Sequence, residues 1–407
     1  MTTPASSQIT LGSSAYMRAE TALFLAGFAS FSLIYCVQPL LPEFAQTFRV
    51  SPAESALALS YTTGILAVAI LLAGAFSQAL GRRGLMFVSM VLAAALNILA
   101  ALSPSWQGLL ASRALEGLAI GGVPAVAMAY LAEEIDPRDL GRAMGLYVAG
   151  TAFGGMTGRV GMGLLTEWVS WRFAMIMLGV ICLMAATGFM LLLPRSRNFT
   201  AVPGFDIGYH LCSWRKHLRN PALQRQFAIG FLLMGVFVTL FNYSTFRLSG
   251  EPYGLGQTEI SLIFLVYGFG IVSSSAAGSL IGRLGRKLLA ETAFALMLAG
   301  IVLTLSDSLS FVLSGIVLVT IGFFIGHSVA SSAIGPLAGH EKGHAASLYL
   351  LFYYLGSSIV GWASGWVWQL GGWPAIVMLT VTMCATGIVL SSCIGTVKAV
   401  QAKTAEA

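Results

Sequence analysis

Long apolar runs without a single charge are the feature that most constrains this chain. Residues 21–42, 55–81 and 260–282 contain no Lys or Arg, and Glu43 is the first acid after the first run. A helix needs roughly 20 apolar residues to cross the hydrocarbon core of a bilayer, and each run supplies that length. Only 9% of all residues are charged and 57% are hydrophobic, a composition far from that of soluble domains. We therefore predict an all-α polytopic membrane protein.

The apolar runs divide into twelve expected transmembrane helices. A polar segment, residues 194–226, separates six of them in residues 1–193 from six in residues 227–407. Its mixture of basic and apolar side chains predicts a helix that lies on the membrane surface. The expected spans are residues 21–42, 54–77, 85–103, 107–131, 143–166, 172–193, 227–248, 258–281, 288–306, 310–333, 345–368 and 373–396.

One short pattern occurs twice, 204 residues apart: residues 74–83 (GAFSQALGRR) and residues 278–287 (GSLIGRLGRK). A repeat at half the chain length predicts two pseudo-symmetric six-helix bundles. A short turn that ends in paired cations is typical of a cytoplasmic connection between membrane helices. The residues that define the two loops are Gly74, Gln78, Gly81, Arg82 and Arg83 in the first and Gly278, Gly285, Arg286 and Lys287 in the second.

The distribution of cations predicts the orientation in the membrane. If both termini and every second loop are cytoplasmic, those segments hold 17 of the 22 Lys and Arg residues. Cytoplasmic loops are enriched in Lys and Arg, so we expect a multi-pass protein of the inner (plasma) membrane with both termini in the cytoplasm. The first 20 residues lack the features of a signal peptide and are expected to form a cytoplasmic tail. The net charge of +6 needs no nucleic-acid partner.

Three charges fall inside the expected spans: Arg113, Glu116 and Arg159. Each costs about 2.5 to 3.5 kcal/mol at a helix centre, so such residues usually have a partner or a function. Arg113 and Glu116 are three residues apart and share a helix face. Arg159 is expected at a similar depth in the next, antiparallel span. We expect Glu116 to be shared between the two arginines, or between Arg113 and a proton. The alternative is an ion pair that only holds the spans in register.

Smaller signals mark further candidates. Gly150, Gly154 and Gly158 form a stripe on which another helix can pack closely, either as ordinary packing or as the surface on which the two halves move. His327 lies near the middle of the tenth expected span. It can titrate or bind substrate there, or it can be a hydrogen-bonded structural histidine.

With these features the chain resembles the major facilitator superfamily over nearly its whole length, within the drug:proton antiporter and arabinose-efflux-permease branches. Two departures stand out. The loop of the family carries an acidic residue where this chain has Gln78, and its antiporter motif carries proline where this chain has Arg159. The resemblance rests on the two loops, on Arg113 with Gly117, on Gly150, Gly154 and Gly158, and on Trp171-Arg172-Phe173 at the start of the sixth span.

The resemblance implies a secondary transporter that works by alternating access, with the two loops as conformational switches. It favours proton-coupled efflux of small amphipathic compounds or sugars. Glu116 is the best proton carrier, because residues 21–42 contain no acid. The expected partners are a small-molecule substrate, protons and the lipid bilayer. We expect a functional monomer, no cofactor beyond the proton gradient and no metal. Four polar residues lie on helices that line the cavity in this family and are candidates for substrate binding or proton coupling, with ordinary hydrogen bonds between helices as the alternative: Tyr35, Gln38, Asn242 and Tyr243.

Two alternatives remain. The buried Arg113 and Arg159 would also suit the transport of small organic anions. A membrane sensor or an intramembrane protease is a more distant possibility, because residues 340–344 (HEKGH) match the zinc-protease pattern H-E-x-x-H. That chemistry requires a helix that presents both histidines on one face, whereas Pro336, Gly339 and Gly343 favour a loop. We therefore expect no enzyme activity.

Overall fold

Helix forms most of each expected span in the computed structural model, which describes residues 8–198, 207–339 and 341–394, with the backbone only for residues 74–80, 125 and 207. These residues contain no strand, only an isolated bridge between Ile9 and Ile135, and the all-α fold is confirmed. Eight of the described segments are long and apolar enough to cross a membrane. The longest, Lys342–Ser392, holds two expected spans. The structure is thus consistent with twelve spans, a number that stays a prediction.

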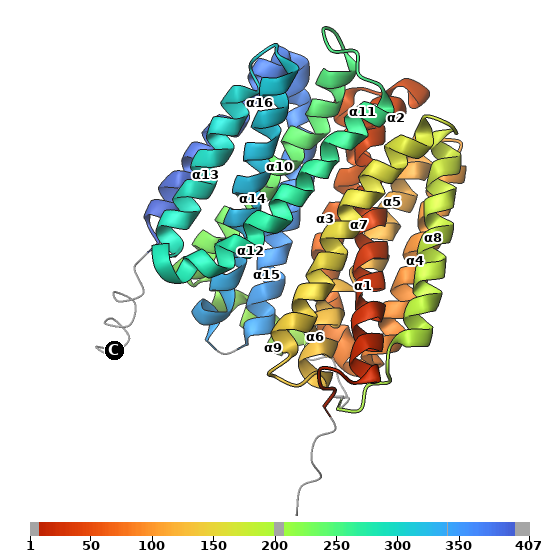
Figure 1. The fold of residues 1–407 in the computed structure, drawn as a ribbon, viewed down its shortest axis with the longest axis vertical. Coiled ribbons are helices and arrows are strands. Elements are labelled where there is room, and N and C mark those ends of the chain that lie inside the picture. The colour runs from red at the N-terminus through yellow and green to blue at the C-terminus, as the bar shows by residue number, and fades with distance from the viewer. Residues whose placement is uncertain (1–7, 199–206, 340, 395–407) are drawn as a thin grey trace, which may run out of the picture. The chain divides into compact units, whose positions relative to one another are not determined.

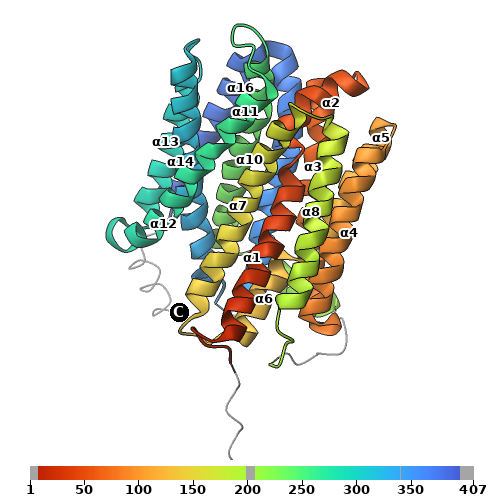
Figure 2. The ribbon, with the colours of Figure 1, turned by 45° about the vertical axis from the view of Figure 1, so that its right-hand side comes forward.

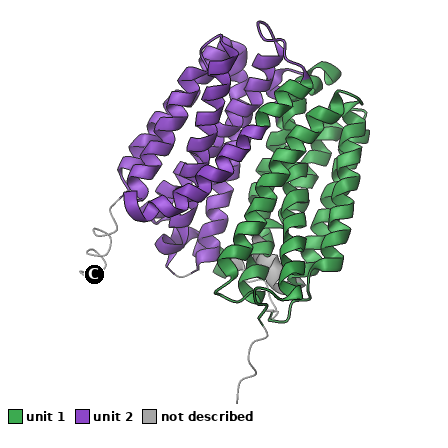
Figure 3. Cartoon of the chain, in the orientation of Figure 1, with its two compact units in different colours: residues 1–49, 57–210, 257–264 green, residues 50–56, 211–256, 265–407 purple. Residues whose placement is uncertain are grey.

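The chain forms two compact units (Figure 3). Unit 1 consists of residues 1–49, 57–210 and 257–264, and unit 2 consists of residues 50–56, 211–256 and 265–407. Each unit therefore takes in a short segment from the other half of the sequence. The division into bundles at residues 194–226 stays a proposal.

In unit 1, the first helix packs along α7 and α8, while α4 packs along α5 and α8 (Figures 1 and 2). Serine side chains cap three of these helices by accepting a backbone N–H of the first turn, as N-cap residues do. The helices of the N-terminal half are α1 (Ser14–Tyr35), η1 (Gln38–Leu40), α2 (Leu41–Phe48), α3 (Pro52–Leu80), α4 (Arg82–Leu102), α5 (Trp106–Ile120), α6 (Pro124–Glu134), α7 (Leu140–Thr166) and α8 (Trp171–Leu192).

In unit 2, helix α13 packs along α14 and α16, and α10 packs along α14, α15 and α16. Helix α16 is kinked at Gly371 and Gly372, whose backbone angles leave helical geometry between the two last expected spans. The helices of the C-terminal half, of which α11 belongs to unit 1, are α9 (Ile207–Leu218), α10 (Pro221–Ser249), α11 (Gln257–Leu262), η2 (Ile263–Val266), α12 (Tyr267–Leu284), α13 (Arg286–Leu303), α14 (Leu309–Ala338), α15 (Lys342–Leu355), η3 (Gly356–Val360, a π-helical turn) and α16 (Gly361–Ser392).

The duplicated loops are single-residue turns. Helix α3 continues to Leu80, so most of residues 74–83 is helical rather than a turn. Gly81 alone leaves the helix, at φ 82° and ψ 147°, and Gly285 repeats that conformation at φ 79° and ψ 157°. A positive φ is accessible to glycine without a Cβ clash, which explains why both copies keep this residue. The internal repeat is therefore present in the backbone.

Several helix ends differ from the sequence-based boundaries. Helix α1 begins at Ser14, so part of the expected tail is helical, and α10 begins at Pro221 rather than at residue 227. The side chains of Ser13 and Asn220 cap these two helices. Hydropathy alone misses these first turns, because polar residues continue a helix beyond its apolar stretch. The linker contains helix α9, and the expected position of this helix on the membrane surface stays a prediction.

Candidate functional site

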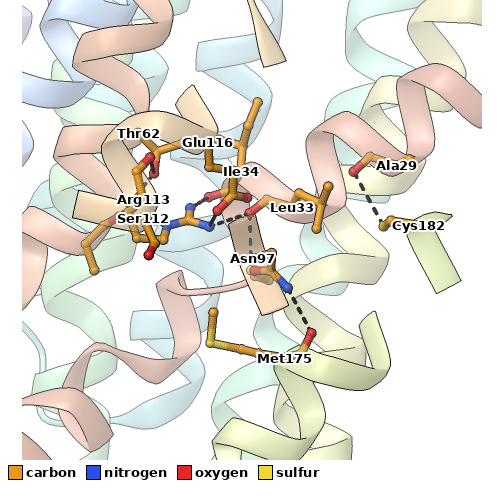
Figure 4. Close-up of polar contacts among 12 residues, drawn as sticks. Ala29, Leu33, Ile34, Thr62, Asn97, Ser112, Arg113, Glu116, Met175 and Cys182 are labelled. Atoms are coloured by element: carbon orange, nitrogen blue, oxygen red, sulfur yellow. Dashed lines mark hydrogen bonds and ion pairs between the residues drawn. The ribbon is translucent and has the colours of Figure 1, made fainter. Parts of the chain in front are cut away.

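The ion pair between Arg113 and Glu116 lies in the interior of unit 1 (Figure 4). Both residues are on α5, and Nη1 of Arg113 lies 2.6 Å from Oε2 of Glu116. Neither side chain has any exposed surface. The spacing of three residues places them on one helix face, as expected. The structure thus contains the predicted pair, fully buried.

Arg113 also joins three helices. Its Nη1 and Nη2 donate to the carbonyl oxygens of Leu33 and Ile34 at 3.1 and 2.8 Å, and its Nε donates to the carbonyl of Ala58 at 3.1 Å. Leu33 and Ile34 are in the last turn of α1, where carbonyls lack helical partners and the helix dipole is negative. Arg113 therefore satisfies the end of α1 while it pairs with Glu116.

Glu116 has one oxygen without a hydrogen-bond donor among the described residues. Its Oε2 accepts from Arg113, whereas Oε1 is buried and has no such partner there. An ionised carboxylate can accept several hydrogen bonds, so one bare buried oxygen is costly. A proton on this carboxyl would remove the charge. Among the described residues, Arg113 is therefore the one hydrogen-bond donor to this carboxyl.

The hydrogen bonds that Glu116 and Arg159 form within the described residues do not join these two side chains, contrary to the expected sharing. The Arg159 side chain is 2% exposed, and it donates from Nε to Oε1 of Gln38 at 2.6 Å and from Nη1 to the carbonyl of Gly155 at 2.7 Å. Its guanidinium carbon lies 3.9 Å from the ring centroid of Tyr35, in cation–π geometry. The structure thus groups Arg159 with two predicted residues, Gln38 and Tyr35, rather than with the acid.

Two polar residues near the ion pair were not among the candidates predicted from the sequence. Asn97, fully buried in α4, donates from Nδ2 to the carbonyl of Met175 at 2.8 Å (Figure 4). The thiol of Cys36 lies 3.6 Å from Oδ1 of Asn97. Thr62 donates to the carbonyl of Arg113 at 3.0 Å. A polar amide inside an apolar span is a usable signal for Asn97. A threonine hydroxyl can donate to a backbone carbonyl of its own helix, so a threonine such as Thr62 does not indicate a contact with another helix.

The glycine stripe packs on α1. A Cβ added to Gly150, Gly154 or Gly158 would meet backbone atoms of α1 at 2.7, 2.3 and 2.7 Å. The expected close packing is thus correct. Both helices belong to unit 1, so this contact agrees with ordinary packing, and movement of the two halves on the stripe stays a prediction. Glycine spacing predicts a close neighbour without predicting which helix it is.

In unit 2, the candidate His327 forms a hydrogen bond. Its Nδ1 lies 2.9 Å from the hydroxyl of Tyr349, and its ring stacks on Phe323 with centroids 6.0 Å apart. The ring of Tyr353 is also close, with its centroid 4.7 Å from that of His327. This geometry favours the structural interpretation of His327 within an aromatic cluster.

The span-seven candidates are also in the interior of unit 2. Asn242 and Tyr243 are fully buried in α10. The hydroxyl of Tyr243 donates to the carbonyl of Gly361 at 3.0 Å. For Tyr243 the structure therefore supplies the alternative explanation, a hydrogen bond between helices.

The two loops differ in their ionic contacts. Arg82 binds Glu133 of α6 through Nε at 3.2 Å and Nη2 at 2.6 Å, and Arg83 donates to the carbonyl of Met190. In the second loop, neither Arg286 nor Lys287 forms an ion pair within the described ranges. The side chain of Gln78 lies outside what the structure describes.

The zinc-protease string crosses the start of a helix. His340 lies outside the described residues, while His344 lies in the first turn of α15 rather than in the expected loop. The described residues contain no group of three or more His, Cys, Asp or Glu side chains that could hold a metal ion.

Comparison with known proteins gives a consistent result. The family model of the Major Facilitator Superfamily matches residues 23–361. The uncharacterized MFS-type transporter YybF of Bacillus subtilis (strain 168) is 44% identical over 381 residues, 93% of this chain and 94% of YybF. The inner membrane transport protein YnfM of Escherichia coli (strain K12) is 42% identical over 367 residues, 90% of this chain and 87% of YnfM. The multidrug resistance protein MdtL of Escherichia coli (strain K12 / DH10B) is 28% identical over 357 residues, 86% and 88% of the two chains.

Solved structures agree with the fold. A bacterial homolog of the human lysosomal transporter Spinster, in an inward-facing and occupied conformation, matches with a TM-score of 0.73 at 13% identity, over 94% of each chain. The human organic anion transporter MFSD10 matches with a TM-score of 0.72 at 18% identity, over 92% of this chain and 99% of that chain. At such identities the likeness concerns the fold alone. Together the comparisons confirm the resemblance drawn from the sequence motifs.

Proposed function

Since the chain belongs to the major facilitator superfamily, and is a membrane transporter rather than an enzyme, we propose that it exports small amphipathic compounds or sugars in exchange for protons. In this proposal Glu116 accepts and releases the proton. The proton gradient supplies the energy, and no cofactor takes part. The transporter works as a monomer in the inner membrane, with both termini in the cytoplasm, by alternating access.

The single observation that supports proton coupling is the environment of Glu116. The carboxyl is fully buried, and only one of its oxygens has a partner among the described residues. Arg113 keeps three backbone carbonyl acceptors, which do not titrate, whatever the protonation state of Glu116. The carboxyl can therefore gain or lose a proton without leaving the guanidinium unsatisfied. Such a change alters the net charge of the pair by one unit, and a change in buried charge can shift the equilibrium between two conformations.

The direction and the substrate class are supported by relatives. MdtL, which is similar over most of the chain, is named a multidrug resistance protein, and resistance of that kind is consistent with export. YnfM and YybF are named for transport without a substrate. The choice between amphipathic compounds and sugars therefore depends on the transport experiment.

Transport of small organic anions is the second candidate, and Arg159 favours it. This buried guanidinium bonds to the neutral oxygens of Gln38 and Gly155 and lies over the Tyr35 ring. A buried guanidinium supplies a positive charge and paired N–H donors, which suit a carboxylate or phosphate ligand. In this case Arg159 binds the substrate, and Glu116 only fixes Arg113.

The deciding experiment is transport in proteoliposomes under an imposed pH gradient. Wild type, Glu116→Gln and Arg159→Gln are compared with lipophilic cations, neutral sugars and organic anions as substrates. Glutamine keeps the hydrogen bond to Arg113 but cannot exchange a proton. We expect the gradient to drive a cation or sugar in wild type, and Glu116→Gln to lose this coupling while it still exchanges substrate without a gradient.

The matched control is Glu54→Gln, which removes an exposed carboxyl at the start of α3. It should leave coupling unchanged. If anions move instead, if Arg159→Gln abolishes their transport and if Glu116→Gln stays coupled to the gradient, the exporter proposal is wrong and the anion proposal is correct.

A further inference from the structure

A large apolar cavity in unit 2 lies apart from the residues discussed above. Its volume is about 590 Å³, and it is lined by residues of α9, α10, α15, η3 and α16. Volumes of about 300 to 1,000 Å³ are typical of sites that hold small ligands. The lining is almost entirely hydrocarbon, with Leu218, Phe227, Phe231, Phe352 and Leu390 among its members. A cavity of this kind favours an aliphatic or aromatic occupant over water.

Helix α9 borders one end of the cavity. Leu218, its last residue, contributes to the lining together with Gln224, and Nε2 of Gln224 donates to the carbonyl of Leu218 at 2.6 Å. Arg215 and Lys216 lie within one turn before Leu218, and Arg219 follows it. Three cations therefore stand beside the end of an apolar cavity.

These three cations have no acidic partner in an ion pair among the described residues. Arg215, Lys216 and Arg219 are all exposed. The ion-pair contact that α9 does make joins Nε2 of His217 to Oε2 of Glu341 at 4.0 Å. His217 belongs to the buried face of α9, so this contact leaves the exposed cations uncompensated.

The exposed face of α9 is both cationic and apolar. Leu211 is 55% exposed and Leu218 is 38% exposed on the same helix as Arg215 and Lys216. A helix that presents leucine and basic side chains together is typical of the interface of an anionic bilayer. Basic pockets at the ends of membrane helices bind the headgroups of anionic lipids. The charge pattern thus selects an anionic lipid over a neutral one, and the cavity selects a lipid over a free anion.

We propose that unit 2 binds one anionic phospholipid, with an acyl chain in the cavity and the headgroup phosphate against Arg215, Lys216 and Arg219. The bound lipid fastens the end of α9 to α10, α15 and α16. This site is independent of the proposed proton exchange at Glu116, and it stands whichever substrate the protein transports.

The test is native mass spectrometry of the purified full chain, titrated with phosphatidylglycerol or with phosphatidylcholine of the same acyl chains. Wild type should retain phosphatidylglycerol more tightly. The variant Arg215→Gln/Lys216→Gln/Arg219→Gln should lose about fivefold in affinity for each cation removed, which ends the preference. Ala228→Trp, which fills the cavity, should release the tightly held lipid, and Thr386→Trp repeats this test from α16 if the first variant fails to fold.

Two comparisons can overturn the proposal. The control Arg138→Gln/Arg142→Gln removes exposed cations of unit 1 and should keep the preference for phosphatidylglycerol. A loss as large as that of the α9 variant, or equal retention of both lipids by wild type, contradicts a specific site. Inorganic phosphate should not displace the lipid. If it displaces the lipid fully, the site binds anions alone and the acyl-chain assignment is wrong.

Discussion

In unit 1, helix α5 carries Arg113 and Glu116, whereas the matching positions of α14 in unit 2, 205 residues later, are Leu318 and Ile321. The glycine that follows is kept in both, as Gly117 and Gly322. A Cβ on Gly117 would meet a backbone oxygen at 2.2 Å, and one on Gly322 would do so at 2.5 Å. The two units thus share the close helix contact, but the residues beside it are charged in unit 1 and aliphatic in unit 2.

The interior of unit 2 is aromatic where that of unit 1 is charged. Phe237 and Phe323 stack with centroids 3.8 Å apart, and Tyr267 and Phe324 pack edge to face against them. His327 extends this cluster to Tyr349. Aromatic pairs add to the energy of burial without any charge to compensate. The comparison teaches that duplication preserved the packing, while the two copies acquired different polar and aromatic contents.

The largest loss of stability is expected when Arg113 alone is replaced by the leucine found at the matching position of unit 2. Arg113→Leu leaves Glu116 buried without its partner, which should cost about 3 to 5 kcal/mol of stability. The double variant Arg113→Leu/Glu116→Ile removes both charges and should recover much of this loss, because no bare charge remains. Thermal unfolding in detergent measures both variants. A double variant as unstable as the single one would show that the carbonyls of α1 and α3, rather than Glu116, account for the cost.

An intermediate effect is expected at a second pair of shared glycines, Gly154 and Gly356, which lie 202 residues apart in the same register as Tyr147 and Tyr349. Gly154→Ala and Gly356→Ala each place a methyl group about as close to a backbone oxygen, at 2.3 Å from Phe28 and 2.2 Å from Phe231. Each should lower the stability by about 1 to 3 kcal/mol through overpacking. Gly161→Ala is the control, because a Cβ there meets nothing within 4 Å. If only one of the two shared glycines is sensitive, the packing of the units is less alike than the backbone distances indicate.

The smallest effect is expected at the duplicated loops. Arg82→Gln removes a partly buried ion pair with Glu133 and should cost about 1 kcal/mol or less. Arg286→Gln, its counterpart in unit 2, has no such pair among the described residues and should change stability by no more than about 0.5 kcal/mol. The same unfolding measurement applies. Equal losses at the two sites would contradict the ionic difference between the loops.

Much of the fold could be predicted from the sequence. The uncharged runs predict the positions of the helices, since no other secondary structure of a single segment satisfies its backbone in lipid. The repeat of residues 74–83 at 278–287 predicts the paired turns, and both contain a glycine at positive φ. The first turns of α1 and α10 were missed, because capping by Ser13 and Asn220 extends these helices into polar sequence.

The candidate site could be predicted only in part from the sequence. A spacing of three residues within one helix fixes the pairing of Arg113 with Glu116, since local geometry brings them together. The partner of Arg159 depends on another helix, and the structure supplies Gln38 rather than Glu116. The partners of Asn97 also lie on other helices, so its role was not predicted, although a polar residue in an apolar span is visible in the sequence.

The sequence by itself determined the membrane helices, the duplication and the pairing within α5, because each depends on composition or on spacing along one helix. Only the tertiary structure decided that α1 packs on the stripe of Gly154, that its last carbonyls bind Arg113 and that an apolar cavity forms beside the cations of α9. These features join residues that are distant in the chain. Their geometry follows from the packing of whole helices, which no local pattern encodes.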